Sequence, residues 1–248
     1  MLNTESYKKQ RGRRLLVALI ASGLSLLLPA LLLADEQAID LDRLDEGRYV
    51  CTYEEHYYDG VGESVFSLKK IAGGYEAVWD GINDSTTLYA DEDFRTQGIT
   101  LRSEKRNLQL ERRGDRIEVT GTVEGERVDE TLQIDSPRWF QLLPFSLISF
   151  VQSGEDEVEF SLFDPFNMKM RNMKISRKGE ETVSLFGSDY RTVKLNMRMR
   201  GFLSPFWKSE IWTDADSGTH VKYEGLNVEP ERYESKIYLK KVEFVPEN

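Results

Sequence analysis

Alternation of apolar and polar residues with a period of two is the feature that most constrains this fold. From Arg48 onward such runs are separated, roughly every eight to twelve residues, by turn signals such as Asp59-Gly60, Gly73-Gly74 and Asp80-Gly81. Pairs of this kind favour tight hairpins. No alternation of strands with amphipathic helices occurs, which excludes doubly wound and (β/α)-barrel folds. The pattern predicts an all-β antiparallel meander, with roughly six or seven strands before residue 135.

One segment breaks this alternation. Residues 136–151 read SPRWFQLLPFSLISFV and have no clear polar face. Ser136 and Pro137 are suited to begin a helix, and Pro144 prevents one smooth helix, so we expect two short helical turns. A segment that is apolar on all sides must be covered, or must face a membrane or an apolar ligand. We therefore predict a strongly curved sheet or half-open barrel around this segment, which serves either as a core plug or as a lid.

Strands resume after this segment, with alternating apolar residues from Val158 onward. We expect a bulge near Asn172 and a turn at Lys178-Gly179-Glu180. All five methionines beyond Met1 lie in this region, between 168 and 199. Methionine adapts its shape to acyl chains or variable peptides, although the same residues also serve as ordinary core. The predicted ligand-binding residues are Met168, Met170, Met197, Met199, Trp139, Phe140, Leu143, Phe145 and Leu147.

The N-terminus has the pattern of an export signal. Five basic residues and one acidic residue precede the uncharged run LLVALIASGLSLLLPALLLA, which ends at Ala34 before Asp35 and Glu36. The stretch Leu15–Leu33 is also just long enough to span a bilayer if it is not cleaved. We predict a signal peptide or uncleaved membrane anchor at 1–34, a charged lead-in at 35–47, and a single β domain at 48–248. In either case residues 35–248 are exported.

Charge and composition exclude several classes of function. Loss of residues 1–34 leaves 28 basic and 42 acidic side chains, a net charge of −14. Such a surface repels phosphates, and no basic patch with interleaved aromatic residues is present, so nucleic-acid binding is not expected. The single cysteine and two histidines exclude a disulfide framework and a multi-histidine metal centre.

Two local patterns invite a chemical interpretation. Asp214 and Asp216 before Gly218 resemble the opening of a calcium loop, but the further oxygen ligands are missing and a hairpin turn is favoured. His56 lies beside Glu54 and Glu55, but no nucleophile elbow accompanies it, so it is read as a strand histidine. We therefore expect no enzymatic activity, no catalytic residues, no metal and no cofactor.

The closing third of the chain resembles a known family. The residues that carry the resemblance are Gly179-Glu-Glu-Thr-Val183, Gly187, Tyr190–Met197 and Trp212-Thr-Asp214…Gly218-Thr-His-Val-Lys222-Tyr-Glu224. This pattern of residues resembles that of the bacterial envelope family called domain of unknown function 3108, over about residues 135–224. The resemblance implies a curved antiparallel sheet that wraps a short helix, similar to the lipoprotein carriers of the periplasm. It implies no catalytic residues.

Two hypotheses follow. The first is an exported, non-enzymatic, periplasmic envelope protein that holds an apolar ligand, such as a lipid or an acylated partner, in the concave face of its sheet. The alternative is a scaffold or interaction component of an envelope complex, anchored in the inner membrane by Leu15–Leu33 and facing the periplasm. The expected partners are an apolar small molecule, a lipid or an envelope protein.

Overall fold

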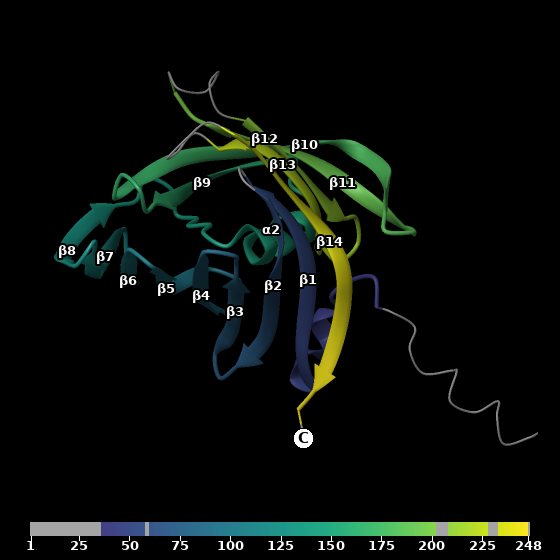
Figure 1. The fold of residues 1–248 in the computed structure, drawn as a ribbon, viewed down its shortest axis with the longest axis horizontal. Helices are drawn as coiled ribbons and strands as arrows, with labels where there is room; N and C mark the ends of the chain where they lie inside the picture. Colours follow the sequence, from purple (N-terminus) through teal and green to yellow (C-terminus); the bar gives the residue numbers. More distant parts are fainter. Residues whose placement is uncertain (1–35, 58–59, 202–207, 228–232, 248) are drawn as a thin grey trace, which may run out of the picture. The chain divides into compact units, whose positions relative to one another are not determined.

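The computed structural model describes residues 36–57, 60–201, 208–227 and 233–247. The predicted signal or anchor at 1–34 lies outside these residues. Glu36–Asn248 form one compact unit, in which a single antiparallel sheet of fourteen strands is described (Figure 1). No helix in the described part of the chain has the length and apolar character needed to cross a membrane.

The first half of the chain is a continuous meander that follows a short 3-10 helix, η1 (Leu41–Asp45). Eight strands are described where the sequence predicted six or seven, because the charged region around Leu101 and Leu108 forms two paired strands, Thr96–Ser103 and Arg106–Arg113. The strands are β1 (Gly47–Tyr57), β2 (Gly60–Ile71), β3 (Gly74–Asp80), β4 (Asp84–Asp91), β5 (Thr96–Ser103), β6 (Arg106–Arg113), β7 (Arg116–Val123) and β8 (Glu126–Gln133).

The second half returns along the other side of the same sheet. Its strands are β9 (Glu157–Asp164), β10 (Lys169–Leu185), β11 (Ser188–Met199), β12 (Lys208–Asp214), β13 (His220–Asn227) and β14 (Tyr233–Pro246). The strand order is β8-β7-β6-β5-β4-β3-β2-β1-β14-β13-β12-β11-β10-β9. The pairing of β1 with β14 therefore joins the two meanders, and β8 and β9 are the two ends of a curved sheet that does not close. The predicted fold class is confirmed.

The strand predictions near Lys178 were wrong. β10 runs without a turn through this point, and its register shifts between Arg177 and Gly179. Gly179 has a φ of +136°, which absorbs the irregularity, while the residues beyond it go on pairing with β11. Pairing with β9 is regular past Asn172, so the bulge lies at Arg177–Gly179 instead.

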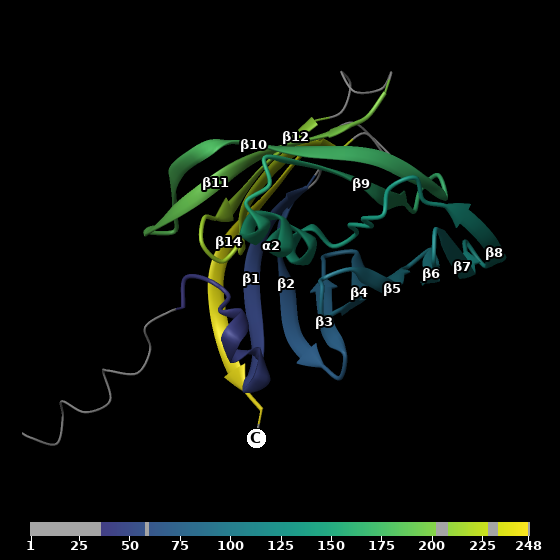
Figure 2. The ribbon, with the colours of Figure 1, turned by 180° about the vertical axis from the view of Figure 1, so that it is seen from behind.

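The apolar segment forms one helix rather than two turns, α2 (Leu143–Ser153). Pro144 lies in its first turn, where its missing N–H is not needed, so the proline begins the helix instead of dividing it. Ser136 does not cap a helix; its hydroxyl donates to the carbonyl oxygen of Glu159 and accepts from the N–H of Arg138. Figures 1 and 2 show α2 in the hollow of the curved sheet.

The helix is covered on opposite sides by different parts of the sheet. Phe145 and Ile148 pack into a cluster with residues of β1–β4, β13 and β14. Leu147, Phe150 and Val151 pack into a second cluster with residues of β9–β12. Full burial of each such side chain contributes about 1.5–3 kcal/mol. The helix is therefore part of the core, as the plug interpretation expects.

Candidate functional site

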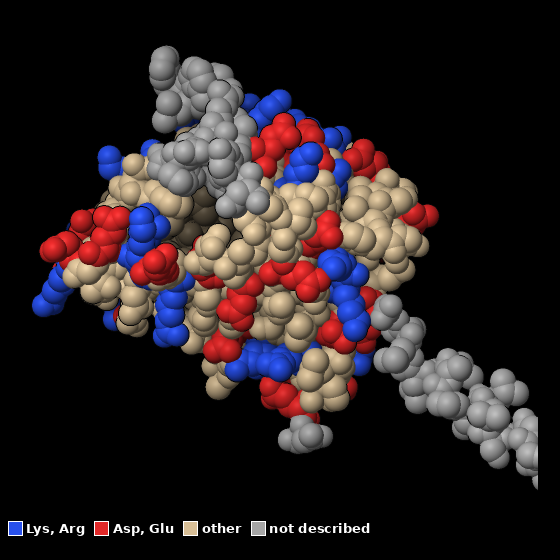
Figure 3. All heavy atoms as spheres, in the orientation of Figure 1, with Lys and Arg blue, Asp and Glu red and all other residues tan. Residues whose placement is uncertain are grey.

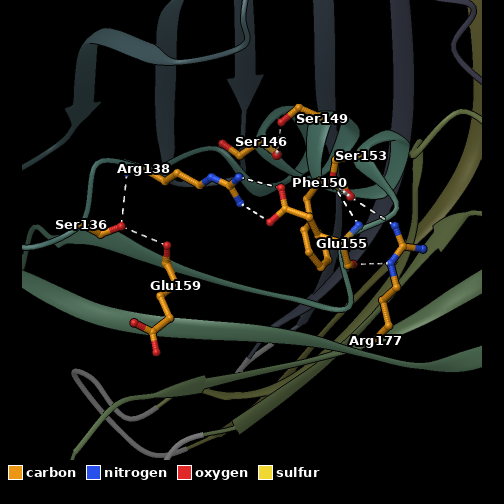
Figure 4. Close-up of polar contacts among 9 residues, drawn as sticks. All are labelled: Ser136, Arg138, Ser146, Ser149, Phe150, Ser153, Glu155, Glu159 and Arg177. Carbon is orange, nitrogen blue, oxygen red and sulfur yellow. Dashed lines mark hydrogen bonds and ion pairs between the residues drawn. The ribbon is translucent and has the colours of Figure 1, made fainter.

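A polar network connects the ends of the apolar segment to the sheet (Figure 4). Before the helix, Arg138 makes a bidentate contact with Glu155, with N–O distances of 2.7 and 2.9 Å. At the C-terminal end of the helix, Arg177 of β10 donates from Nε to the carbonyl oxygen of Glu155 at 2.7 Å, and from Nη2 to the carbonyl oxygen of Val151 at 2.6 Å. A cation at the C-terminal end of a helix satisfies carbonyls that lack intrahelical partners. These contacts hold both flanks of α2 in place.

The free edge of β9 is covered by the strand-like residues that precede α2. The N–H of Phe140 donates to the carbonyl oxygen of Ser161, and the N–H of Ser161 donates to the carbonyl oxygen of Arg138, at 3.0 and 2.8 Å. The side chain of Gln141 then bonds both the N–H and the carbonyl of Phe163, at 2.9 and 3.0 Å. An edge strand covered in this way cannot pair with other chains along this stretch.

Among the described residues, two cavities lie against α2, one at each end of the helix. The first, which we call the Met197 cavity, has a volume of about 350 Å³ and meets the N-terminal end of the helix. Its walls are mainly apolar and aromatic, formed by Trp79, Leu142, Leu143, Pro144, Leu162, Met197, Tyr223 and Ile237. The remaining lining residues are polar: Glu55, Asp84, Gln141, His220 and Ser235.

The titratable groups of the Met197 cavity are held toward their neutral forms. Burial raises the pKa of Glu55, and the nearby charge of Asp84 raises it further, against the hydrogen bond from Ser64. Burial also raises the pKa of Asp84. The pKa of His220 falls to about 4 because the ring is buried, and its Nδ1 has no hydrogen-bond partner among the described residues. Each shift has desolvation of the charged form as its main cause.

The second cavity, which we call the Arg112 cavity, has a volume of about 590 Å³ and meets the C-terminal half of the helix. Its charged lining residues are Asp93, Arg95, Arg112, Arg138 and Glu155. Uncharged residues complete the wall: Phe94, Pro137, Trp139, Phe140, Ser149, Phe150 and Ser153. This cavity is therefore more polar and richer in arginine than the Met197 cavity.

The nine predicted ligand-binding residues do not gather at one site. Met197 and Leu143 line the Met197 cavity, whereas Trp139 and Phe140 line the Arg112 cavity. Phe145 and Leu147 are fully buried on opposite sides of α2, and Met199 packs at the margin of the cluster that contains Leu147. Met168 and Met170 pack against a third cluster, formed mainly by β5–β7, Ile134, Trp139 and Phe163.

The methionine strands are neighbours, as the interpretation of a soft apolar face requires. On the β10–β11 pair, Met173 lies opposite Met199 and Ile175 lies opposite Met197. The sequence did not identify the polar lining residues of either cavity as ligand-binding residues. Glu55 lies two residues after the buried Tyr53, and Arg112 lies two residues after the buried Leu110. Residues two apart on a strand share one face, so this spacing is the signal that would have placed both on the inner face of the sheet.

The two other sequence patterns are engaged in local contacts. Asp214 Oδ1 accepts hydrogen bonds from the N–H of Ser217 at 2.8 Å and of Asp216 at 3.2 Å, in the manner of a turn. Asp216 pairs with Arg191. His56 contacts Glu54 at 2.8 Å and lies edge-on to the ring of Tyr238. On the face shown in Figure 3, acidic and basic side chains are interspersed.

No protein-family model matches the chain, and no curated protein sequence matches it. Several solved structures, in contrast, do match the chain. A beta-barrel-like protein of the domain of unknown function DUF1849 from Brucella abortus superposes with a TM-score of 0.55 and 11% identity, over 81% of this chain and 98% of that one. The chain shares that fold.

Two further structures have lower similarity. The hypothetical lipoprotein YmcC from Escherichia coli has a TM-score of 0.35 and 12% identity, over 77% of this chain and 86% of that one. A putative exported protein with a YmcC-like fold from Bacteroides fragilis has a TM-score of 0.29 and 13% identity, over 80% and 96%. The similarity in fold therefore rests on the Brucella abortus structure, and membership of the family of unknown function 3108 stays a prediction.

Proposed function

We propose that this chain is an exported, non-enzymatic envelope protein that holds an apolar ligand, a lipid or the acyl group of a partner, in the Met197 cavity. The observation that carries the proposal is the composition of that cavity. Eight of its thirteen lining residues are apolar or aromatic, and a small set of polar groups lies among them. Sites for small apolar molecules have this composition and begin at about 300 Å³.

The position of the cavity also favours an apolar ligand. It lies where the apolar N-terminal end of α2 faces the concave side of β11, β13 and β14, so a chain that enters meets Leu143, Met197 and Ile237 together. Met197 is only 1% exposed, and the unbranched methionine side chain can change rotamer to admit a ligand.

The charge of the cavity selects among apolar ligands. When Glu55 and Asp84 are ionised, they repel an anionic head group placed beside them. When protonated, each carboxyl donates a hydrogen bond to an ester or amide oxygen. Neutral acyl esters and amides, rather than free fatty acids, are therefore the ligand class that the cavity favours.

The absence of catalysis belongs to the same proposal. A general base needs a titration range near the working pH, and the lowered pKa of His220 keeps it neutral and unsuited to that role. His56 is engaged with Glu54 and Tyr238 and is not among the residues that line the cavity. Export is supported by the basic and apolar pattern of residues 1–34.

The proposal is tested with the full-length chain, purified as the cell produces it, and a neutral fluorescent diacylglycerol. The variant Ile237→Trp fills the cavity and should weaken binding about tenfold or more, since the apolar contact volume is lost. The matched control is Val245→Trp, a similar enlargement on the same strand at an exposed position. Parent protein that binds neither the probe nor copurified native lipid would overturn the proposal.

The conservative variant Met197→Leu tests the methionine itself. It keeps the volume of the side chain and should cost under about 1.5 kcal/mol of stability. If methionine provides adaptability, the variant should bind a single acyl length as well as the parent does and accept a narrower range of lengths. An unchanged range of accepted lengths would show that Met197 is only packing in the core.

A further inference from the structure

We propose that Arg112 anchors a compact oxyanion, a carboxylate or a phosphate, in the Arg112 cavity. This site is separate from the Met197 cavity, because it meets Ser149, Phe150 and Ser153 in the C-terminal half of α2 rather than its N-terminal end. The proposal therefore stands or falls independently of the proposed function.

Arg112 occupies an inward-facing position of the sheet. On β6, Leu108 and Leu110 are fully buried on the concave side, and Arg112 continues that row two residues later. Side chains two residues apart on a strand share one face. A guanidinium on the face otherwise used for core packing is costly unless its charge and donors are satisfied.

The donors of Arg112 are only partly satisfied. Its Nε donates to the carbonyl oxygen of Gly114 at 3.1 Å and its Nη2 donates to that of Pro137 at 2.8 Å. Its Nη1 is buried and has no hydrogen-bond partner among the described residues. Two neutral carbonyls thus fix the orientation of the guanidinium and leave one of its nitrogens without an acceptor.

The other two arginines of the cavity already contact carboxylates. Arg138 is paired with Glu155, and Arg95 lies 3.2 Å from Asp93. No ion pair joins Arg112 to any acid in the described ranges. Two lining carboxylates against three guanidinium groups leave a net positive charge in the cavity, on a protein whose exported part is strongly acidic.

Electrostatics around Arg112 favour an added anion. Burial lowers the pKa of Arg112, and repulsion from Arg95 lowers it further, with only partial opposition from Asp91. The Asp91 carboxylate is itself engaged by the N–H of Arg95 and by Gln97 Nε2, at 2.9 and 2.8 Å. An oxyanion between Arg112 and Arg95 would relieve that repulsion, and a guanidinium presents paired N–H groups that match a carboxylate or phosphate.

The anion has two possible sources. The cavity is large enough for a free phosphate with its water, and its wall also contains Phe94, Phe140 and Phe150, which suit an apolar body attached to the anion. Inorganic phosphate and dodecyl phosphate carry the same head group and differ only in the attached chain. Comparison of the two therefore separates a free anion from an anionic lipid.

The experiment is isothermal titration calorimetry of the full-length chain with each compound, up to about 10 mM for phosphate, the range that still resolves weak binding. Arg112→Gln should weaken binding about tenfold or more. The matched control is Arg113→Gln, the next residue of β6, which is exposed and contacts Glu111 and Glu118. It removes the same charge outside the cavity and should leave affinity within about twofold.

Two further variants guard against a folding defect. Arg112→Lys keeps the positive charge but loses the paired N–H groups of the guanidinium, so we expect an affinity between those of the parent and Arg112→Gln. Arg95→Gln changes an exposed side chain and should weaken binding by roughly threefold without altering thermal unfolding. Binding of dodecyl phosphate alone assigns an anionic lipid, and binding of both assigns the head group. Failure to bind either compound, or an equal loss in Arg113→Gln, would overturn the proposal.

Discussion

Arg177 on β10 donates a hydrogen bond of 2.6 Å to the main-chain carbonyl oxygen of Val151 in the last turn of α2. The same guanidinium reaches the carbonyl oxygens of Phe150 at 3.2 Å and of Glu155 at 2.7 Å. One side chain thus holds three carbonyls at the end of the helix. Figure 4 shows its contacts with Phe150 and Glu155. The bulge beside Gly179 lies immediately after Arg177, where β10 changes register.

Replacement of this side chain tests how firmly α2 is held. Arg177→Met keeps much of the apolar stem and removes the three donated bonds, so the free energy of unfolding should fall by about 2 kcal/mol or more. Arg177→Lys offers one charge that cannot reach all three carbonyls and should recover less than half of the loss. Urea unfolding measures both. Equal stability of parent and Arg177→Met would show that the contacts contribute nothing net.

A second prediction concerns the close approach of Gly218 to α2. A Cβ at Gly218 would lie 2.8 Å from the Cα of Ile148, and the residue has a φ of +77°. Gly218→Ala should therefore cost more than the roughly 1–2 kcal/mol of a left-handed alanine, because the turn must also move away from the helix. The matched control is Gly125→Ala, at a φ of +87° with open space around it. Similar losses in the two variants would refute the contact.

A third prediction follows from the buried His220. Its folded-state pKa of about 4 lies below the unfolded value of about 6.5, so the unfolded chain binds the extra proton between these values. The stability from the neutral ring is complete above pH 6.5 and is lost as the pH falls toward 4, by about 3 kcal/mol. His220→Phe should remove that part of the slope. Denaturation at pH 7 and pH 5 measures it, and an unchanged slope would contradict the burial of the ring.

A fourth prediction concerns Glu55 and Asp84, whose raised pKa values act in the opposite direction. At pH values just above the ordinary pKa of a carboxyl group, the folded protein binds more protons than the unfolded chain does. The free energy of unfolding that these two groups contribute therefore falls as the pH rises. The double variant Glu55→Gln with Asp84→Asn should be more stable than the parent at pH 7 and nearly equal to it at pH 4. Glu130→Gln, on exposed β8, is the control. A double variant less stable than the parent at pH 7 would contradict the assignment.

Much of the strand content could be predicted because it is local. The alternation of residues such as Val193, Leu195 and Met197 identifies both the strand and its buried face, and the structure buries all three. The apolar character of Trp139–Val151 likewise required cover on all sides, and α2 has it. Errors occurred where pairing overrode a local signal, as at Gly179, where twelve residue pairs along β10 and β11 outweigh one turn-like glycine.

The sequence by itself determined most of the strands, their buried faces and the apolar character of residues 136–151, since each of these is expressed in the spacing of neighbouring residues. Tertiary structure decided which faces meet. The pairing of β1 with β14 joins residues almost the whole domain apart, and both cavities are lined by residues of α2 together with residues of distant strands. Sheet curvature and the placement of the helix are set by long-range packing. The spacing of residues on β6 could therefore predict that Arg112 faces inward, but it could not predict that Arg112 Nη1 lacks a hydrogen-bond partner.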